Sequence, residues 1–536
     1  MLRHPQTSSG FRVAIRGIGN RLLSGLLLAA TMVAPRAAAQ DNPKATQFAA
    51  PVDHIDALLR ESWREDAIEP AGRSDDAEFC RRIWLDLAGV APPVWQLRAF
   101  LADESVDKRS RLVDELLRSP RFAIHMANRW TESLLPANTT AIPTEQGRAL
   151  NQWLRDQFLV NKPYDHLIGG FLTAGNSSDQ GPAIFYTSRE ADPVKLAAAT
   201  SRLFMGIQLE CAQCHDHPFS TWTQDDFWSF AAFYSQVELD ENAAMQARPA
   251  IRDRRGKEVN FPETDRVMPP RYPGVAAEPE PDPTDFRRRQ LTIWLASRDN
   301  PYFARAAVNR AWSHLFGRGL VDPVDDMDLD NPPSHPEVLD YLTEYLIETR
   351  FDLRELYRVL ASTEAYSLSS RYARALDQPR PPLDTFAVMS VKTLSPEQFY
   401  DTLMQNIFLS KQPNQVMGQD PLRASFLTRM RSTEATSVDY PHGVVQSLGL
   451  MNGPEMRQAI SPQASGLIQS FDAPFLSNTE RVETLFLACL SRLPSDEEAA
   501  MFGELLGESD DVAAQKNRLS DLTWVLLNTA ECFVCP

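Results

Sequence analysis

The segment LAAATSRLFMGIQLECAQCHDHPF, residues 196–219, decides how the first half of the chain is expected to fold. Its apolar side recurs every three or four positions, the spacing of one face of an α-helix, at Leu196, Thr200, Leu203, Phe204 and Ile207. The pattern predicts a helix that runs directly into Cys211.

The same periodicity continues along the chain. Leu339, Leu342 and Leu346 form another apolar stripe. Helix starts are predicted where Ser or Asp precedes Glu or Gln by three residues, at Asp75, Ser334, Ser395 and Ser495. Strand patterns are scarce, and the best one, at 250–261, predicts a short β-hairpin around a charged turn. The sequence therefore predicts a mostly α-helical protein.

Proline and acidic residues dominate 262–283, which includes EPEPDP at 278–283. This composition is typical of an extended linker, because it offers little apolar surface to a core. We therefore expect two helical domains, at 50–240 and 286–532, with the hairpin and the proline-rich acidic linker between them at 241–285.

Cys211, Cys214 and His215 form a C-x-x-C-H motif, which is the attachment site of c-type haem. Two thiols three residues apart can form thioethers with both vinyl groups of the porphyrin, and the next imidazole can ligate the iron. We predict that these three residues bind a covalent haem c. His215 is the predicted axial ligand, and His217 is predicted to support it at the metal. The sequence leaves the sixth iron ligand open, with His125, His335 and Met451 as candidates.

Two other uses of the motif stay open. A C-x-x-C pair in an exported protein can be a short disulfide or a pair of free thiols. The motif and the nearby His217 together also supply four possible zinc ligands, although structural zinc sites usually take two ligand pairs from separate loops. That set is Cys211, Cys214, His215 and His217.

Residues 1–39 predict export. They carry several arginines and no acidic residue, and an apolar run at 22–34 is followed by three alanines before Gln40. This order is typical of a secretory signal peptide. We expect a periplasmic or secreted protein with no transmembrane segment in the mature chain, because no other apolar run has the length of a membrane span.

The net charge limits the classes of molecule that the protein is expected to bind. The net charge is −17 and no basic cluster with aromatic residues occurs, which argues against nucleic acid as a partner. A redox function would need a partner protein, which the sequence does not identify.

Four cysteines lie outside the motif, and they allow three disulfide pairings that the sequence does not distinguish: Cys80, Cys489, Cys532 and Cys535.

An acidic segment, DDMDLDN at 325–331, has carboxylates spaced as in a calcium-binding loop when Glu337 is included. Asn331 stands where such a loop takes glycine, and three prolines follow, so we favour a helix start at Ser334 instead. Buried structural ion pairs are the favoured use of the polar residues nearby, with binding of a carboxylate or phosphate as the alternative. These residues are Arg305, Asn309, Arg310 and Arg318. Sequence motifs of serine hydrolases, zinc proteases and phosphate-binding loops are absent.

Several longer stretches resemble a known family. Residues 79–89, 111–122 and 211–219 are similar to the planctomycete cytochrome-type domain of unknown function. Residues 300–305, 308–310, 315–320, 331–337 and 521–531 are similar to the planctomycete-specific C-terminal domain. The resemblance covers nearly the whole mature chain, and its cytochrome label implies haem through the same C-x-x-C-H motif.

The sequence thus predicts an exported c-type haem-binding protein with a role in electron transfer or haem-based redox chemistry. A non-redox structural or interaction protein, whose motif holds a metal ion or a disulfide, is the alternative. A metal-dependent hydrolase of extracellular polymers is a weaker one.

Overall fold

The structure is a computed structural model that describes residues 43–135, 145–175, 181–218, 220–240, 251–274, 282, 284–372, 379–409, 421–430, 451, 453–473, 475–507 and 511–536. Phe48–Pro536 forms one compact unit. The predicted signal peptide at 1–39 lies outside the described residues, as does most of the EPEPDP stretch.

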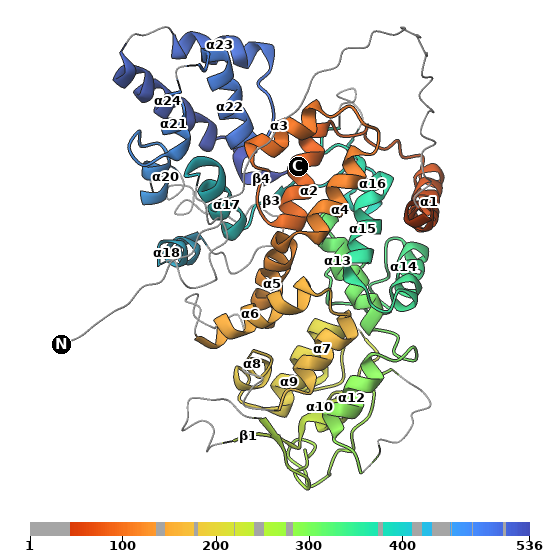
Figure 1. Ribbon diagram of the computed structural model, residues 1–536. Helices are drawn as coiled ribbons and strands as arrows, with labels where there is room; N and C mark the ends of the chain where they lie inside the picture. Colours follow the sequence, from red (N-terminus) through yellow and green to blue (C-terminus); the bar gives the residue numbers. More distant parts are fainter. Residues whose placement is uncertain are drawn as a thin grey trace, which may run out of the picture. The chain divides into compact units, whose positions relative to one another are not determined.

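The described chain is mostly helical, as the apolar periodicity predicted (Figure 1). Its first part contains α1 (Pro43–Glu65), α2 (Asp76–Ala88), α3 (Val94–Ala102), α4 (Lys108–Arg118), α5 (Pro120–Leu134), α6 (Glu145–Leu159), α7 (Tyr164–Leu172), α8 (Ile184–Thr187), α9 (Pro193–Thr200) and α10 (Gln224–Ala231). The middle part contains β1 (Val237–Leu239), β2 (Ile251–Asp253), α12 (Arg287–Leu295), α13 (Phe303–Phe316), α14 (Pro336–Glu348), α15 (Leu353–Ser362) and α16 (Glu364–Ser367). The last part contains β3 (Lys392–Thr393), α17 (Pro396–Thr402), α18 (Pro421–Met430), α20 (Pro454–Ala459), α21 (Gly466–Ser470), α22 (Asn478–Leu490), α23 (Asp496–Leu506), α24 (Val512–Leu527) and β4 (Val534–Cys535).

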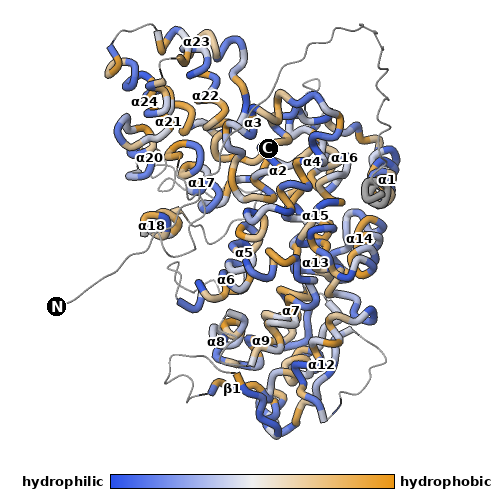
Figure 2. Tube along the Cα trace, viewed as in Figure 1, coloured by the Kyte–Doolittle hydropathy of each residue, from blue (hydrophilic) through white to orange (hydrophobic). Residues whose placement is uncertain are grey.

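Two apolar cores hold the unit Phe48–Pro536 together. Figure 2 shows hydrophobic and hydrophilic residues alternating along the helices, as expected when one face of each helix is buried. The first core joins Phe171 and Tyr234, which precede 262–283, to Leu291 and Trp312, which follow it. The second core is formed by the C-terminal helices together with Leu85 of α2. The domain boundary in the linker stays a prediction, but side chains on both sides of it share one core.

Local sequence signals identify several helix starts correctly. Ser395 and Ser495 each form the predicted capping box, with Gln398 and Glu498 respectively, and Asp75 accepts a hydrogen bond from the backbone of its predicted helix. The prediction at Ser334 is wrong. The helix there, α14, begins at Pro336, because the Ser334 hydroxyl instead donates to the carbonyl oxygen of Leu320 at 3.3 Å.

The predicted helix into Cys211 is also wrong in its end point. After α9 the chain continues as a wider helical turn, Ser201–Met205, and stops at Gly206, whose φ is 69°. This left-handed conformation is one that glycine adopts without steric cost, and it ends a helix. Cys211 therefore lies on a separate short turn, Leu209–Ala212.

The predicted strand segment at 250–261 does not pair with itself. Its β2 pairs antiparallel with β1, so that Ile251 lies opposite Leu239 and Asp253 opposite Val237. Arg288 of α12 holds this sheet from the other side of the linker, with Nε 2.8 Å from Oδ1 of Asp253. A second small sheet joins β3 to β4 at the C-terminus. The sequence did not indicate it, because its two strands are very short and distant in the chain.

Candidate functional site

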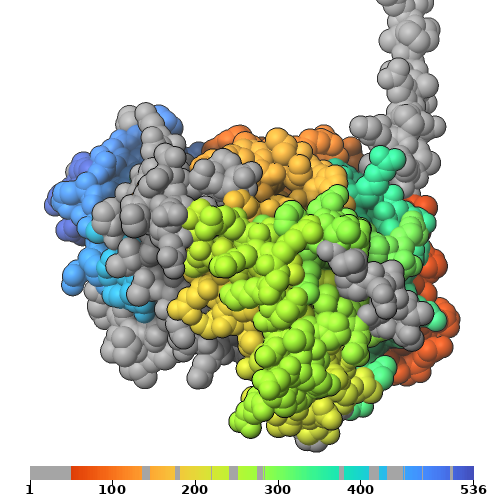
Figure 3. All heavy atoms as spheres, turned by 90° about the horizontal axis from the view of Figure 1, so that it is seen from below, coloured from red at the N-terminus to blue at the C-terminus, as the bar shows by residue number. Residues whose placement is uncertain are grey.

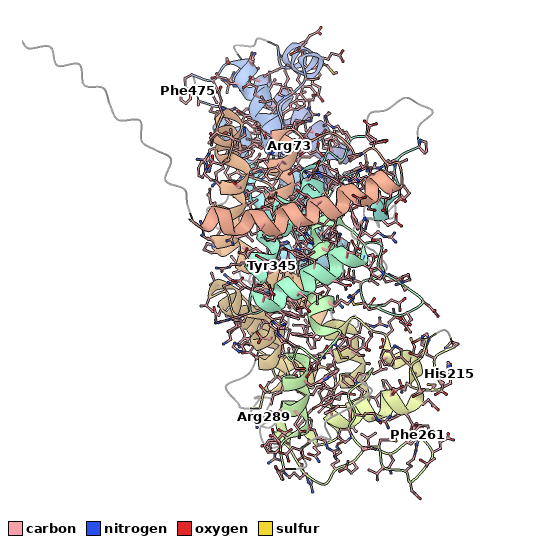
Figure 4. The ribbon with its side chains drawn as sticks, turned by 90° about the vertical axis from the view of Figure 1, so that its right-hand side faces the viewer. Arg73, His215, Phe261, Arg289, Tyr345 and Phe475 are labelled. Atoms are coloured by element: carbon pink, nitrogen blue, oxygen red, sulfur yellow. The ribbon has the colours of Figure 1, made fainter. Side chains whose placement is uncertain are left out.

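The C-x-x-C-H motif lies on the loop between α9 and α10, where the yellow-to-green segments of the chain form the surface (Figures 1 and 3). Leu209 and Ala212 are fully buried and anchor the turn in the first core. Cys211, Cys214 and His215 are exposed. Figure 4 shows His215 at the outer edge of the molecule. The alternation of buried and exposed residues on this turn therefore presents both thiols and the imidazole to solvent.

Hydrogen bonds to α10 fix the loop. The backbone N–H of Gln224, the first residue of α10, donates to Oδ1 of Asp216 at 2.9 Å. An acidic side chain at this position satisfies a free helical N–H group and interacts favourably with the positive end of the helix dipole. The indole of Trp228 donates to the carbonyl oxygen of Gln213 at 3.1 Å. Both bonds attach the motif to a helix that is itself packed in the core.

The His215 ring has a defined tautomer. Its Nδ1 lies 2.8 Å from the carbonyl oxygen of Asp216. A carbonyl oxygen can only accept, so Nδ1 carries the proton and donates. In the neutral ring, Nε2 then carries no proton and has a free lone pair. Metal-binding histidines usually have this arrangement, in which one ring nitrogen ligates the metal and the other donates to a backbone carbonyl. These donors fit a haem c group, which Cys211 and Cys214 would hold covalently and His215 would ligate.

The two motif thiols are free and differ in their surroundings. All six cysteines of the chain are unpaired, and only Cys211 and Cys214 are exposed. Partial burial and the neighbouring Glu210 carboxylate raise the pKa of Cys211, so this residue is a thiol at neutral pH. Cys532 and Cys535 have the same C-x-x-C spacing, but both are buried, and Pro536 follows them instead of histidine.

The described residues do not form an assembled set of zinc ligands. Within the described ranges, no group of three or more His, Cys, Asp or Glu side chains is placed to hold a metal ion. A zinc ion bound by Cys211, Cys214, His215 and His217 would therefore need these side chains to rearrange.

The acidic segment at 325–331 is packed beside the motif, which the sequence did not reveal. The backbone N–H of Met327 donates to the carbonyl oxygen of Gly206 at 2.8 Å. Nε of Arg202 lies 2.7 Å from Oε1 of Glu210 and 3.5 Å from Oδ2 of Asp325, so one guanidinium connects the motif turn to the acidic segment.

The acidic segment is electrostatically coupled to the motif loop. Burial and the neighbouring Asp328 and Asp325 carboxylates raise the pKa of Asp326, while His217 acts in the opposite sense. His217 therefore faces this segment, and its backbone N–H donates to the carbonyl oxygen of Trp222 at 2.8 Å. Asn331 donates to the carbonyl oxygen of Asp326 at 2.9 Å, so it closes a turn within the segment.

The three candidate sixth ligands lie elsewhere. His125 is buried in α5 beside His314, with ring centroids 5.5 Å apart. His335 precedes α14 and contacts Phe386. Met451 is exposed, and its carbonyl oxygen accepts a hydrogen bond from Trp524. No hydrogen bond, ion pair or ring contact in the described part of the chain joins any of them to Cys211, Cys214 or His215.

The four polar residues of the C-terminal family region have different roles. Arg305 pairs with Asp340, and Arg318 lies 3.7 Å from Asp322. Asn309 is fully buried and exchanges two hydrogen bonds with the backbone of Val321. Arg305 and Arg318 thus form ion pairs, as predicted, but these pairs are partly exposed and not buried, and Asn309 forms hydrogen bonds in place of an ion pair. Arg310 forms no ion pair within the described residues and donates instead to the carbonyl oxygen of Arg202 at 2.7 Å.

Among the described residues, no helix combines the length and apolar character that a membrane span requires. No curated protein and no solved structure matches the chain. Residues 54–239 match the family PSCyt2, described as a protein of unknown function (DUF1549), and residues 287–438 match PSD1, described as a protein of unknown function (DUF1553). The resemblance seen in the sequence is thereby confirmed, and the chain belongs to the planctomycete cytochrome-like family in which a PSCyt2 domain is followed by a PSD1 domain.

Proposed function

We propose that this protein is an exported c-type haem protein that acts in electron transfer or haem-based redox chemistry, in the periplasm or outside the cell. The observation that carries the proposal is the state of the motif. Two free thiols are exposed next to an imidazole whose Nδ1 proton is held by a backbone carbonyl, which leaves Nε2 available to a metal.

Each residue of the motif has a separate task in this proposal. Cys211 and Cys214 attach the porphyrin, and their exposure allows the ligation machinery to reach both sulfur atoms. His215 ligates the iron through Nε2, while its bond to the Asp216 carbonyl orients the ring. Bound haem supplies reversible one-electron chemistry. Because the motif is at the surface, a redox partner protein can approach it directly.

Arg202 and Asp216 position the motif. Arg202 pairs with Glu210, which precedes Cys211 in the chain, and also contacts Asp325. Asp216 attaches the loop to the start of α10. These contacts restrict the motion of the turn, so that the thiols and the imidazole stay on one side of it.

The test is a haem stain on a denaturing gel, with protein made in a host that has a periplasmic haem-ligation system. We expect the wild type to retain one haem and the Cys211→Ala/Cys214→Ala variant to retain none. Cys532→Ala/Cys535→Ala is the matched control, because it removes a buried pair of the same spacing and should keep the haem.

If the wild-type protein is colourless, two further measurements distinguish a metal site from a disulfide. One zinc ion per chain in a colourless wild-type protein would favour a non-redox metal site. A crosslink between Cys211 and Cys214, detected by mass spectrometry, would favour a disulfide. Either result would refute the haem proposal.

A further inference from the structure

A cavity of about 130 Å³ lies among α5, α7, α13 and α15. Aromatic side chains form much of its wall: Trp130, Tyr164 and Tyr357. Cys211, Cys214 and His215 do not line it. The volume is close to that of an engineered cavity, about 150 Å³, that takes up benzene. A single flat ring is therefore about the largest body that the cavity encloses.

One wall residue presents a polar group without a partner. Tyr164 is 1% exposed, and its hydroxyl group has no hydrogen-bond partner among the described residues. Its ring is held by stacking on Phe303, with centroids 4.9 Å apart, and by contact with Trp130 at 5.7 Å. Buried polar groups are almost always hydrogen-bonded, so an unpartnered hydroxyl in a cavity wall is available to a molecule bound in the cavity.

Two arginine side chains that line the cavity form no ion pair with a described carboxylate. Arg129, which is exposed at this cavity, forms no ion pair or side-chain hydrogen bond with any described residue. Arg310 uses one nitrogen to donate to the Arg202 carbonyl, while its Nε is buried without a partner. Asp325 acts on Arg310 electrostatically but forms its ion pair with Arg202.

These two arginines contrast with their neighbours on and just after α13. The sequence has 71 acidic against 54 basic residues, so carboxylates are abundant. Arg305 and Arg318, which lie on and just after α13, are both paired with aspartates. Two unpaired guanidinium groups at one cavity of such an acidic protein indicate an anion that comes from outside the chain.

We propose that this cavity binds a small organic carboxylate with a flat apolar body. The guanidinium groups of Arg129 and Arg310 bind the carboxylate, because their planar donors match its two oxygens. The Tyr164 hydroxyl donates to the same anion or to a polar substituent. The aromatic wall covers the apolar body.

The site is connected to the C-x-x-C-H motif but does not depend on haem. Arg310 donates to the carbonyl oxygen of Arg202, and the Arg202 side chain pairs with Glu210 beside Cys211. A ligand that binds Arg310 therefore contacts a residue that is two contacts away from the motif turn. Carboxylate binding can be measured on colourless protein, so this inference and the haem proposal can fail separately.

The test is calorimetric titration of the full mature chain with benzoate, with neutral benzamide and with acetate. Benzoate should bind to one site. Benzamide has the same size without the charge and acetate the charge without the ring, so both should bind at least about tenfold more weakly.

Two variants test the residues of the site. Tyr164→Phe removes a hydroxyl that has no partner in the unliganded protein, so its melting temperature should not fall, whereas its affinity for benzoate should drop about tenfold. Arg129→Gln should weaken benzoate by a similar or larger factor. Arg289→Gln is the matched control (Figure 4), because Arg289 pairs with Asp285 on the surface and does not line the cavity.

The proposal is overturned if benzoate gives no saturable heat, or if benzamide binds as tightly as benzoate. It is also overturned if Tyr164→Phe and Arg129→Gln both bind benzoate like the wild type. A fall in the melting temperature of Tyr164→Phe without ligand would show that the hydroxyl already has a structural partner.

Discussion

The backbone N–H of Met327 donates a hydrogen bond of 2.8 Å to the carbonyl oxygen of Gly206. Gly206 ends the helix in front of the C-x-x-C-H motif, and Met327 belongs to the acidic segment that follows α13. The bond crosses from the PSCyt2 match to the PSD1 match. The second family region therefore takes part in fixing the motif of the first.

Replacing Gly206 tests this contact. In Gly206→Ala the new Cβ would lie 3.2 Å from Cβ of Ala306 and 3.3 Å from Sδ of Met327, at a φ of 69°. We expect the free energy of unfolding to fall by about 2–3 kcal/mol, from strain and crowding together. Gly256→Ala is the control, because φ there is 87° and no atom lies within 4 Å of the added Cβ. Urea unfolding of both variants measures the difference, and equal losses would show that the close approach has no cost.

His215 and His217 should have unequal effects on the haem. His215→Ala should lose most haem or its low-spin spectrum, because only His215 directly follows the second cysteine. His217→Ala should keep covalent haem with a modest shift in potential, because His217 faces Asp326 and supports the site from outside. Absorption spectra and redox titration distinguish the two. Equal loss of a bound metal in both variants, with no haem in either, would instead identify a Cys/His metal site.

A buried ion pair should be costly to break. Nζ of Lys392 lies 2.5 Å from Oδ1 of Asp86, with both side chains buried, and the Tyr366 hydroxyl donates to the same carboxylate at 2.8 Å. Lys392→Met leaves the Asp86 charge uncompensated, and we expect a loss of about 3–5 kcal/mol in the free energy of unfolding.

An exposed ion pair provides the comparison. Arg60 and Glu364 are joined at the surface, so Arg60→Gln should cost at most about 1 kcal/mol. Denaturant unfolding measures both variants. A similar small loss in each would mean that water reaches Asp86 once Lys392 is removed.

Stability should fall with acid because of His125. Burial, with smaller contributions from Arg129 and Lys392, lowers the pKa of His125 from 6.5 to about 3. Between these values the unfolded chain binds a proton that the folded one does not, so the free energy of unfolding decreases as pH falls from 6.5 towards 3. His125→Gln should flatten this part of the curve relative to the wild type.

Melting temperatures between pH 7 and pH 4 provide the measurement. Asp56 acts in the opposite sense, because burial raises its pKa to about 6 and the folded chain then binds the extra proton. The difference between variant and wild type cancels the effect of Asp56 and reports His125 together with its neighbour His314, whose pKa is also lowered, by burial and by the nearby Arg129 and His125. Parallel curves would contradict the prediction.

Cleavage in the linker should not separate the two halves. Limited proteolysis is expected to cut between 262 and 285, where the composition is rich in proline and acid. Arg288, after the linker, pairs with Asp253 before it and also bonds to the carbonyl oxygen of Ala174. The fragments should therefore elute together from a sizing column. Separate elution would show that the halves are independent, and first cuts within 194–234 would show that the linker is misplaced.

The sequence by itself determined the features that depend on neighbours a few residues apart. The apolar spacing predicts the helices, and the capping boxes at Ser395 and Ser495 form because their partners lie three residues away. The C-x-x-C-H motif is equally local, since the spacing alone puts two thiols and an imidazole on one turn.

Contacts between distant segments were decided only by the tertiary structure. The approach of Met327 to Gly206, the pairing of β2 with β1 and the stacking of Tyr164 on Phe303 all join residues that no local pattern relates. Such contacts depend on which helix faces bury each other, and many sequences with the same periodicity would pack differently. Local periodicity therefore determines where helices form, while core packing determines which of their side chains meet.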